Sequence, residues 1–75
     1  MDLSTLLLVY PKNVRITIYY RQGKKSASKI VYTGKVKNYH KMPGFEKYLP
    51  KIVESVCWQW HDDYDVDIID NDHDD

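Results

Sequence analysis

Carboxylates are concentrated in the last fifteen residues of this 75-residue sequence, where eight aspartates occur without a lysine or arginine. Asp63, Asp65 and Asp67 occupy alternate positions, as the first three ligands of a calcium-binding loop do. That loop also requires glycine at its sixth position and glutamate at its twelfth, where this sequence has Ile68 and Asp74. The pattern therefore does not predict a metal site, and no cofactor is expected.

The same carboxylates suit contact with a basic protein surface. On an extended strand, side chains of one face repeat about every 6.6 Å, a spacing comparable with that of charges along a nucleic-acid backbone. We therefore expect an acidic partner-binding surface that mimics nucleic-acid phosphates, the alternative being that the aspartates only maintain solubility. The candidate residues are Asp62, Asp63, Asp65, Asp67, Asp70 and Asp72.

A basic set that contains tyrosines provides a second hypothesis. Cations that pair with phosphates, combined with rings that stack on bases, are typical of proteins that bind single-stranded nucleic acid. Neither an RNA-recognition motif nor a glycine-rich phosphate loop accompanies them, so an ordinary solvated sheet face is the alternative. The candidate residues, expected on one face of a hairpin, are Arg15, Tyr19, Lys35, Lys37, Tyr39 and His40.

Catalysis is not expected. Cys57 and His61 could serve as nucleophile and base, but four residues along a strand span about 13 Å, too far to share a proton. No triad or closed ligand set can be drawn from the other residues. A domain of this size also has little interior in which to desolvate reacting groups. The sequence therefore favours a non-enzymatic binding protein.

The formal net charge of zero conceals two oppositely charged parts. All eleven lysines and arginines precede residue 60, together with only Asp2, Glu46 and Glu54. We therefore expect positive and negative charges on separate patches. A single cysteine excludes an intramolecular disulfide and favours a reducing compartment. The first eleven residues have neither the charge pattern of a signal peptide nor the length of a membrane span, so we expect a cytoplasmic protein that does not bind membranes.

These side chains must be positioned by a small α+β fold. A short N-terminal helix is predicted, with Leu3, Leu6 and Leu7 on one face, capped by Asp2 or Ser4 and ended by Pro11. Residues 14–20 alternate apolar and polar side chains, which predicts a half-buried strand. Residues 21–28 are polar and connect it to a second strand over 29–39, where Gly34 indicates a bulge or close packing.

The second half of the chain is harder to interpret. Residues 40–50 predict a loop with one helical turn from Phe45 to Leu49. Residues 51–60 fit a helix or a strand, and their β-branched and aromatic content favours the strand. We expect Trp58 and Trp60 to fill the core, the alternative being an exposed contact for a partner. Residues 61–63 should turn into a strand over 64–70, in which Tyr64, Val66 and Ile68 alternate with Asp65, Asp67 and Ile69.

Together these elements predict a short N-terminal helix packed on a four-stranded antiparallel sheet. We expect one domain over residues 1–70, followed by a disordered acidic tail over 71–75. An edge strand in so small a sheet can pair with a second copy, so a homodimer is left open.

The order of these elements, with GKVKNY at residues 34–39, a proline loop and DDY.V.I at residues 62–68, resembles a loose group of small proteins. These are uncharacterised proteins from phages and mobile elements of Gram-positive bacteria. The resemblance covers residues 3–70, and the aspartate-rich tail and paired tryptophans depart from it. It implies a four-stranded antiparallel sheet with a helix packed on one face, and an accessory role. By elimination we further expect an accessory or inhibitor protein whose partner is a host or mobile-element protein with a basic surface.

Overall fold

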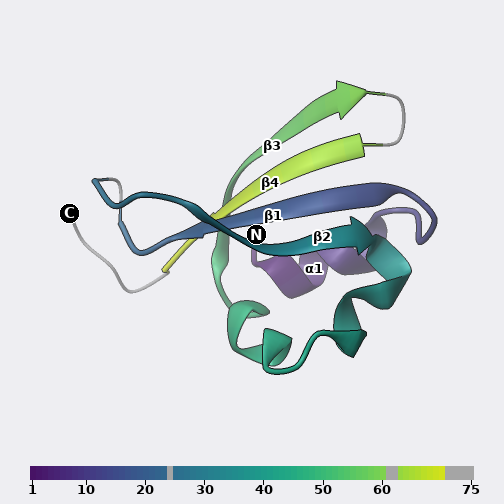
Figure 1. Cartoon of the computed structure of the whole chain (residues 1–75), viewed down its shortest axis with the longest axis horizontal. Coiled ribbons are helices and arrows are strands. Elements are labelled where there is room, and N and C mark those ends of the chain that lie inside the picture. The colour runs from purple at the N-terminus through teal and green to yellow at the C-terminus, as the bar shows by residue number, and fades with distance from the viewer. Residues whose placement is uncertain (24, 61–62, 71–75) are drawn as a thin grey trace.

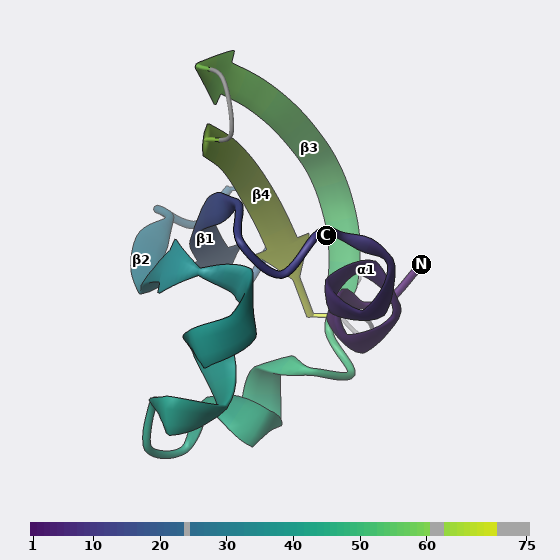
Figure 2. The same cartoon turned by 90° about the vertical axis from the view of Figure 1, so that its right-hand side faces the viewer.

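In the computed structural model, a four-stranded sheet carries all of its helical segments on one side (Figures 1 and 2). The structure describes residues 1–23, 25–60 and 63–70, with only the backbone at 59 and 60. The elements in chain order are α1 (Leu3–Val9), β1 (Arg15–Arg21), β2 (Lys29–Lys35), the 3-10 helices η1 (Val36–Lys41) and η2 (Phe45–Tyr48), β3 (Ile52–Trp60) and β4 (Asp63–Ile69).

The predicted N-terminal helix is confirmed. The Asp2 carboxylate caps α1 by accepting a hydrogen bond from the Thr5 backbone N–H at 2.9 Å. All three leucines of the apolar face are buried. The helix ends before Pro11 because a residue that precedes proline is displaced from helical geometry.

The sheet is mixed, so the expected all-antiparallel arrangement is wrong. Its strand order is β2-β1-β4-β3, with antiparallel outer pairs and a parallel central pair, β1 and β4. After β2, the chain crosses to the opposite edge through η1 and η2 before β3 begins. β4 then returns to the centre parallel to β1. The expectation fails because local patterns identify strands but not the order in which they pair.

The second strand is shorter than the predicted 29–39. β2 ends at Lys35, and Val36 begins η1 as a fully buried residue. Gly34 has φ +147°, and a Cβ at this position would lie 3.0 Å from the Tyr32 hydroxyl. This hydroxyl donates a hydrogen bond to the backbone carbonyl of Lys35. Close packing at Gly34 is therefore confirmed. The irregularity in this hairpin lies instead between Ile18 and Tyr19 of β1, where the register shifts.

Residues 52–60 form a strand, the alternative that the sequence favours, but two register shifts change its alternation. Val53, Val56 and Trp58 pair with residues of β4 that face the helical segments. The expectation that Trp58 fills the core is nevertheless wrong, because 64% of Trp58 is exposed. The tip of the β3–β4 hairpin extends beyond the helical segments (Figure 2), so no described helix covers it. The Trp60 side chain lies outside the described part.

The core lies between the sheet and the helical segments. Phe45 of η2, predicted to lie in a helical turn, is at its centre, with ring centroids of Tyr32, Tyr39 and Tyr48 at 5.7, 5.6 and 5.8 Å. The alternation predicted for β4 is confirmed, since Val66 and Ile68 are fully buried. The complete set of buried apolar residues in the described part of the chain is Leu3, Leu6, Leu7, Val14, Ile16, Ile18, Tyr32, Val36, Phe45, Val66 and Ile68.

Candidate functional site

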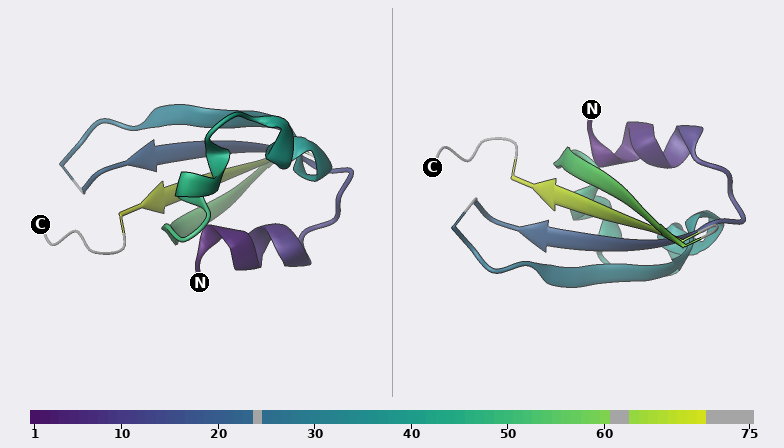
Figure 3. Two further views of the ribbon diagram at one scale, coloured as in Figure 1. Left: turned by 90° about the horizontal axis from the view of Figure 1, so that it is seen from below. Right: turned by 90° about the horizontal axis from the view of Figure 1, so that it is seen from above.

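The face of the sheet opposite the helical segments is the principal candidate surface, and we call it the open face. Because strand side chains alternate, every second residue of each strand lies on it. The right-hand view of Figure 3 shows the strands in front of η1 and η2. From the registers, the polar residues of this face are Arg15, Thr17, Tyr19 and Arg21 of β1, Thr33 and Lys35 of β2, Ser55 and Cys57 of β3, and Asp63, Asp65 and Asp67 of β4.

Three of the predicted acidic residues form a row on the open face. Asp63, Asp65 and Asp67 lie along β4, with successive side chains about 6.6 Å apart. Each is half-buried between neighbouring strands. They share this face because their intervening neighbours, Tyr64 and Val66, point to the apolar side. Local alternation, the signal used at the sequence level, thus places the row correctly.

The carboxylates of this row have different neighbours. Asp63 lies 3.9 Å from the Arg15 guanidinium, and both side chains are about half exposed, so the pair contributes no more than about 1 kcal/mol. Asp67 accepts a hydrogen bond from the Ser55 hydroxyl at 2.8 Å. Asp65 has Thr17 of β1 and Cys57 of β3 as register partners. Asp65 and Asp67, whose other register partner is Tyr19, are therefore the members of the row without a basic residue directly opposite them.

Asp70 does not belong to the open face, which corrects the predicted acidic set. Its carboxylate accepts a hydrogen bond from the Tyr20 hydroxyl at 2.8 Å and pairs with the Lys51 ammonium at 2.6 Å. Only 14% of the Asp70 side chain is exposed. Burial, and next the hydrogen bond to Asp70, raise the pKa of Tyr20 above its ordinary value. Asp62 and Asp72 lie outside the described residues.

Positive and negative side chains are not segregated, so the expectation of separate patches is wrong. Arg15 and Lys35 are register partners at one end of the open face, and Arg15 is also the partner of Asp63. At the other end, Arg21 forms an ion pair with Glu54 of β3. The parallel pairing of β1 with β4 places the basic and acidic strands side by side, and sequence position does not reveal that pairing.

The predicted nucleic-acid surface is divided between two parts of the molecule. Arg15, Tyr19 and Lys35 lie on the open face. Lys37, Tyr39 and His40 lie instead on η1, because the chain leaves the sheet after Lys35. The Tyr39 ring is half-buried against Phe45. These six residues therefore do not make the single basic and aromatic face that the sequence predicts.

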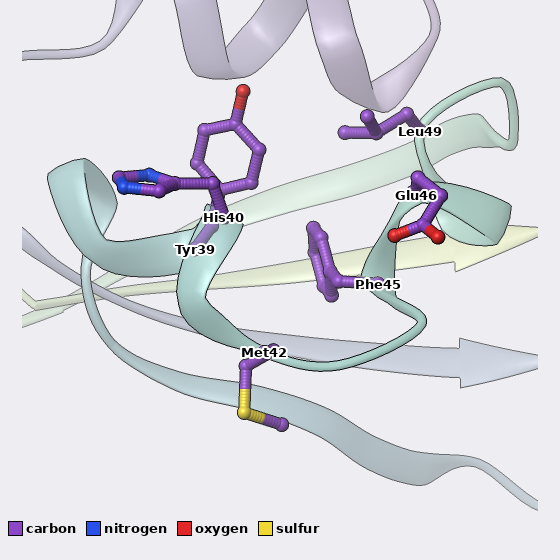
Figure 4. A pocket seen from close by; sticks show the side chains of 6 residues that line it. All are labelled: Tyr39, His40, Met42, Phe45, Glu46 and Leu49. Carbon is purple, nitrogen blue, oxygen red and sulfur yellow. The ribbon is translucent and has the colours of Figure 1, made fainter.

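A hollow of about 170 Å³ lies between η1 and η2 (Figure 4). In this view the His40 imidazole and the Glu46 carboxylate lie on opposite sides of it, with Phe45 and Leu49 nearer the Glu46 side. Within residues 1–23, 25–60 and 63–70, no group of three His, Cys, Asp or Glu side chains is arranged to hold a metal ion.

A lysine cluster that sequence reasoning missed lies on the helical side of the sheet. Lys29, Lys47 and Lys51, with Tyr20 and Tyr48, line a hollow of about 220 Å³. These residues come from β1, β2, η2 and the residue before β3, so no local spacing links all of them. The only sequence signal is the interval of four between Lys47 and Lys51.

Comparison with known proteins identifies no relative. No protein-family model, curated protein or solved structure matches this chain. The resemblance to small phage and mobile-element proteins therefore stays a prediction. In the described part of the chain, every helix is too short or too polar to cross a lipid bilayer.

Proposed function

We propose that this protein is a non-enzymatic accessory or inhibitor protein that binds a partner protein through the open face. The carboxylate row of β4 is the central contact. The observation that supports this proposal is the placement of Asp63, Asp65 and Asp67 at alternate positions of a central strand, on the face that no described helix covers (Figure 2).

The row is suited to recognition because its geometry is fixed. β4 is hydrogen-bonded to β1 on one side and to β3 on the other. Its carboxylates are therefore held at constant spacing without the loss of backbone freedom that a disordered acidic segment would incur on binding. A preorganised surface of this kind also favours one partner geometry over others.

The chemistry of the row specifies a basic partner surface. Arg15 partly neutralises Asp63, which leaves Asp65 and Asp67 as the carboxylates most available to an incoming cation. The hydroxyls of Thr17 and Thr33, which lie 3.2 Å apart, and the ring of Tyr19 are close by in register. These groups can hydrogen-bond and stack on an arginine, whose planar guanidinium also pairs well with carboxylates.

The spacing of the row connects this proposal with mimicry of nucleic acid. Carboxylates repeating about every 6.6 Å along a rigid strand offer a partner a series of negative charges such as a phosphate backbone offers. The partner class that fits best is a host or mobile-element protein whose basic surface itself binds nucleic acid. An oligonucleotide should then compete for the same basic surface.

The test compares the isosteric variant Asp65→Asn with Glu46→Gln, a matched control that removes one exposed carboxylate outside the open face. We expect a partner captured from host lysate by the unmodified protein to be retained by Glu46→Gln. Asp65→Asn should abolish its capture or weaken it about tenfold, because this variant removes one desolvated, charge-assisted hydrogen bond. An added oligonucleotide should release the partner.

Equal capture by the three proteins would contradict a role for the row. Direct binding of the oligonucleotide to this protein, abolished by Arg15→Gln and insensitive to Asp65→Asn, would replace the proposal with nucleic-acid binding.

A further inference from the structure

The lysine cluster on the helical side of the sheet has the shape and charge of a small anion site. Its hollow of about 220 Å³ lies where the end of β1, the start of β2, η2 and the residue before β3 meet. Two tyrosine rings, Tyr20 and Tyr48, form part of its wall, with centroids 5.3 Å apart. The hollow is smaller than the roughly 300–1,000 Å³ typical of sites for drug-sized ligands. It suits a small polar group.

Two of the three ammonium groups are held in place by these rings. Lys47 Nζ lies 5.2 Å from the centroid of the Tyr48 ring, and Lys51 Nζ lies 5.8 Å from that of Tyr20. Cation–π attraction restrains a lysine that would otherwise sample many rotamers. Lys29 reaches the hollow from the start of β2. The three cations are thus gathered from separate elements around one space.

The cluster carries an excess of positive charge. Among the described residues, Asp70 is the acidic side chain that contacts it, pairing with Lys51 at 2.6 Å. Lys51 is thus paired, and the ammonium groups of Lys29 and Lys47 supply the positive charge that an anion in the hollow would meet. Each of these two ammonium groups has three N–H donors. A ligand with about two negative charges and several acceptor oxygens would complement this arrangement.

We propose that this hollow binds the terminal phosphate of a small phosphate monoester. Such a group carries about −1.5 to −2 charge at pH 7 and three strong acceptor oxygens. Lysine is an established phosphate ligand that acts as a point charge. A phosphodiester of a nucleic-acid backbone carries one negative charge and extends on both sides of the phosphorus, which suits a continuous groove better than a small hollow. The tyrosine rings can contact the rest of the small molecule.

The experiment measures binding of inorganic phosphate, dimethyl phosphate and a short single-stranded oligonucleotide by calorimetry and by amide chemical shifts. The pocket variant is Lys29→Gln with Lys47→Gln. The control is Lys37→Gln with Lys41→Gln, which removes the same charge from exposed positions of η1 outside the hollow. Both variants change only exposed lysines, and their amide spectra report whether the fold is intact.

We expect inorganic phosphate to shift the amide resonances of Lys29, Tyr48 and Lys51. It should bind at least about tenfold more tightly than dimethyl phosphate, because the lysines also attract its second negative charge. The pocket variant should weaken phosphate binding about a hundredfold, at roughly tenfold for each charge-assisted hydrogen bond that it removes. The control should bind as the unmodified protein does. Binding of the partner on the open face should not change, so this proposal and the proposed function fail separately.

Three results would overturn the phosphate site. One is the absence of phosphate binding in the unmodified protein. Another is equal weakening by the pocket and control variants, which would mean that net charge alone attracts the anion. The third is oligonucleotide binding that is stronger than phosphate binding and depends on Lys29 and Lys47, which would make the hollow part of a nucleic-acid contact.

Discussion

Two regions on the same side of the sheet have similar side chains and different environments. Near α1 and η2, Val66 and Ile68 of β4 are fully buried. On the edge strand β3, Val56 and Trp58 face the same side but are 41% and 64% exposed. Tyr10 contacts Tyr64, the β4 register partner of Trp58, at 5.1 Å, so the cover reaches β4 at this level but leaves Trp58 of β3 exposed. Residue type and strand register are thus insufficient to specify a core, because a second layer must also reach the position.

The largest expected effect is in the covered region, at Phe45. Phe45→Ala should reduce the free energy of unfolding by about 3–5 kcal/mol because it empties the centre of the aromatic cluster. The total for a chain of this length is about 4–11 kcal/mol, so this variant should be largely unfolded or close to it. Urea denaturation followed by circular dichroism measures the change. Phe45→Leu is the control and should retain most of the stability; a loss below about 1 kcal/mol for Phe45→Ala would show that η2 does not anchor the core.

The most direct comparison of a covered with an exposed position uses two register partners, Val66 of β4 and Val56 of β3. Val66→Ala should cost about 2 kcal/mol, since a fully buried side chain loses two carbon atoms and leaves a cavity. Val56→Ala, directly across the hairpin, should cost less than half as much because its side chain is already partly in water. Parallel urea titrations give both values. Equal losses would show that the edge strand β3 is covered at Val56 in solution.

A smaller effect is expected at high pH, through Tyr20. Its pKa is raised mainly by burial and then by the hydrogen bond to Asp70, so the folded state disfavours the phenolate. The stabilising contribution is present below pH 10, the ordinary value, and is lost as pH rises through the raised pKa. Tyr20→Phe should cost about 1 kcal/mol at neutral pH and lessen the alkaline decline. Thermal melts across this range test the sign; an unchanged decline would assign it to other groups.

The smallest effect is expected at the tip. Trp58→Ser should change the free energy of unfolding by no more than about 1 kcal/mol, because most of the indole is exposed. The sequence interpretation that places Trp58 in the core would predict a loss of about 3–5 kcal/mol for truncation of this residue. Chemical denaturation separates these outcomes without ambiguity.

Local features of this fold were predictable from sequence, whereas the relations between them were not. The capped α1, the alternation in β1 and β4 and the helical turn at Phe45 depend on short-range spacing and are confirmed. The parallel pairing of β1 with β4 is not encoded in either strand alone. The register shifts in β3 change which of its side chains face the helical segments. A sequence pattern that assumes regular alternation cannot anticipate this change.

The candidate sites show the same contrast between groupings set by local spacing and groupings set by long-range contacts. Asp63, Asp65 and Asp67 could be grouped from sequence because one strand carries them all. Asp70 was assigned to them wrongly because nothing in its neighbours reveals its contacts with Tyr20 and Lys51. The hollow lined by Lys29, Lys47 and Lys51 was missed because its residues converge only after the chain has crossed the sheet.

The parallel pair at the centre of the sheet also has a consequence for how the chain folds. Each hairpin can form from nearby residues, but β1 and β4 can pair only after β3 has turned back into β4. Closing so long a loop is entropically costly and slows folding relative to local contacts. On the ribosome, the edge of β1 that pairs with β4 therefore stays without its partner until the last strand has emerged.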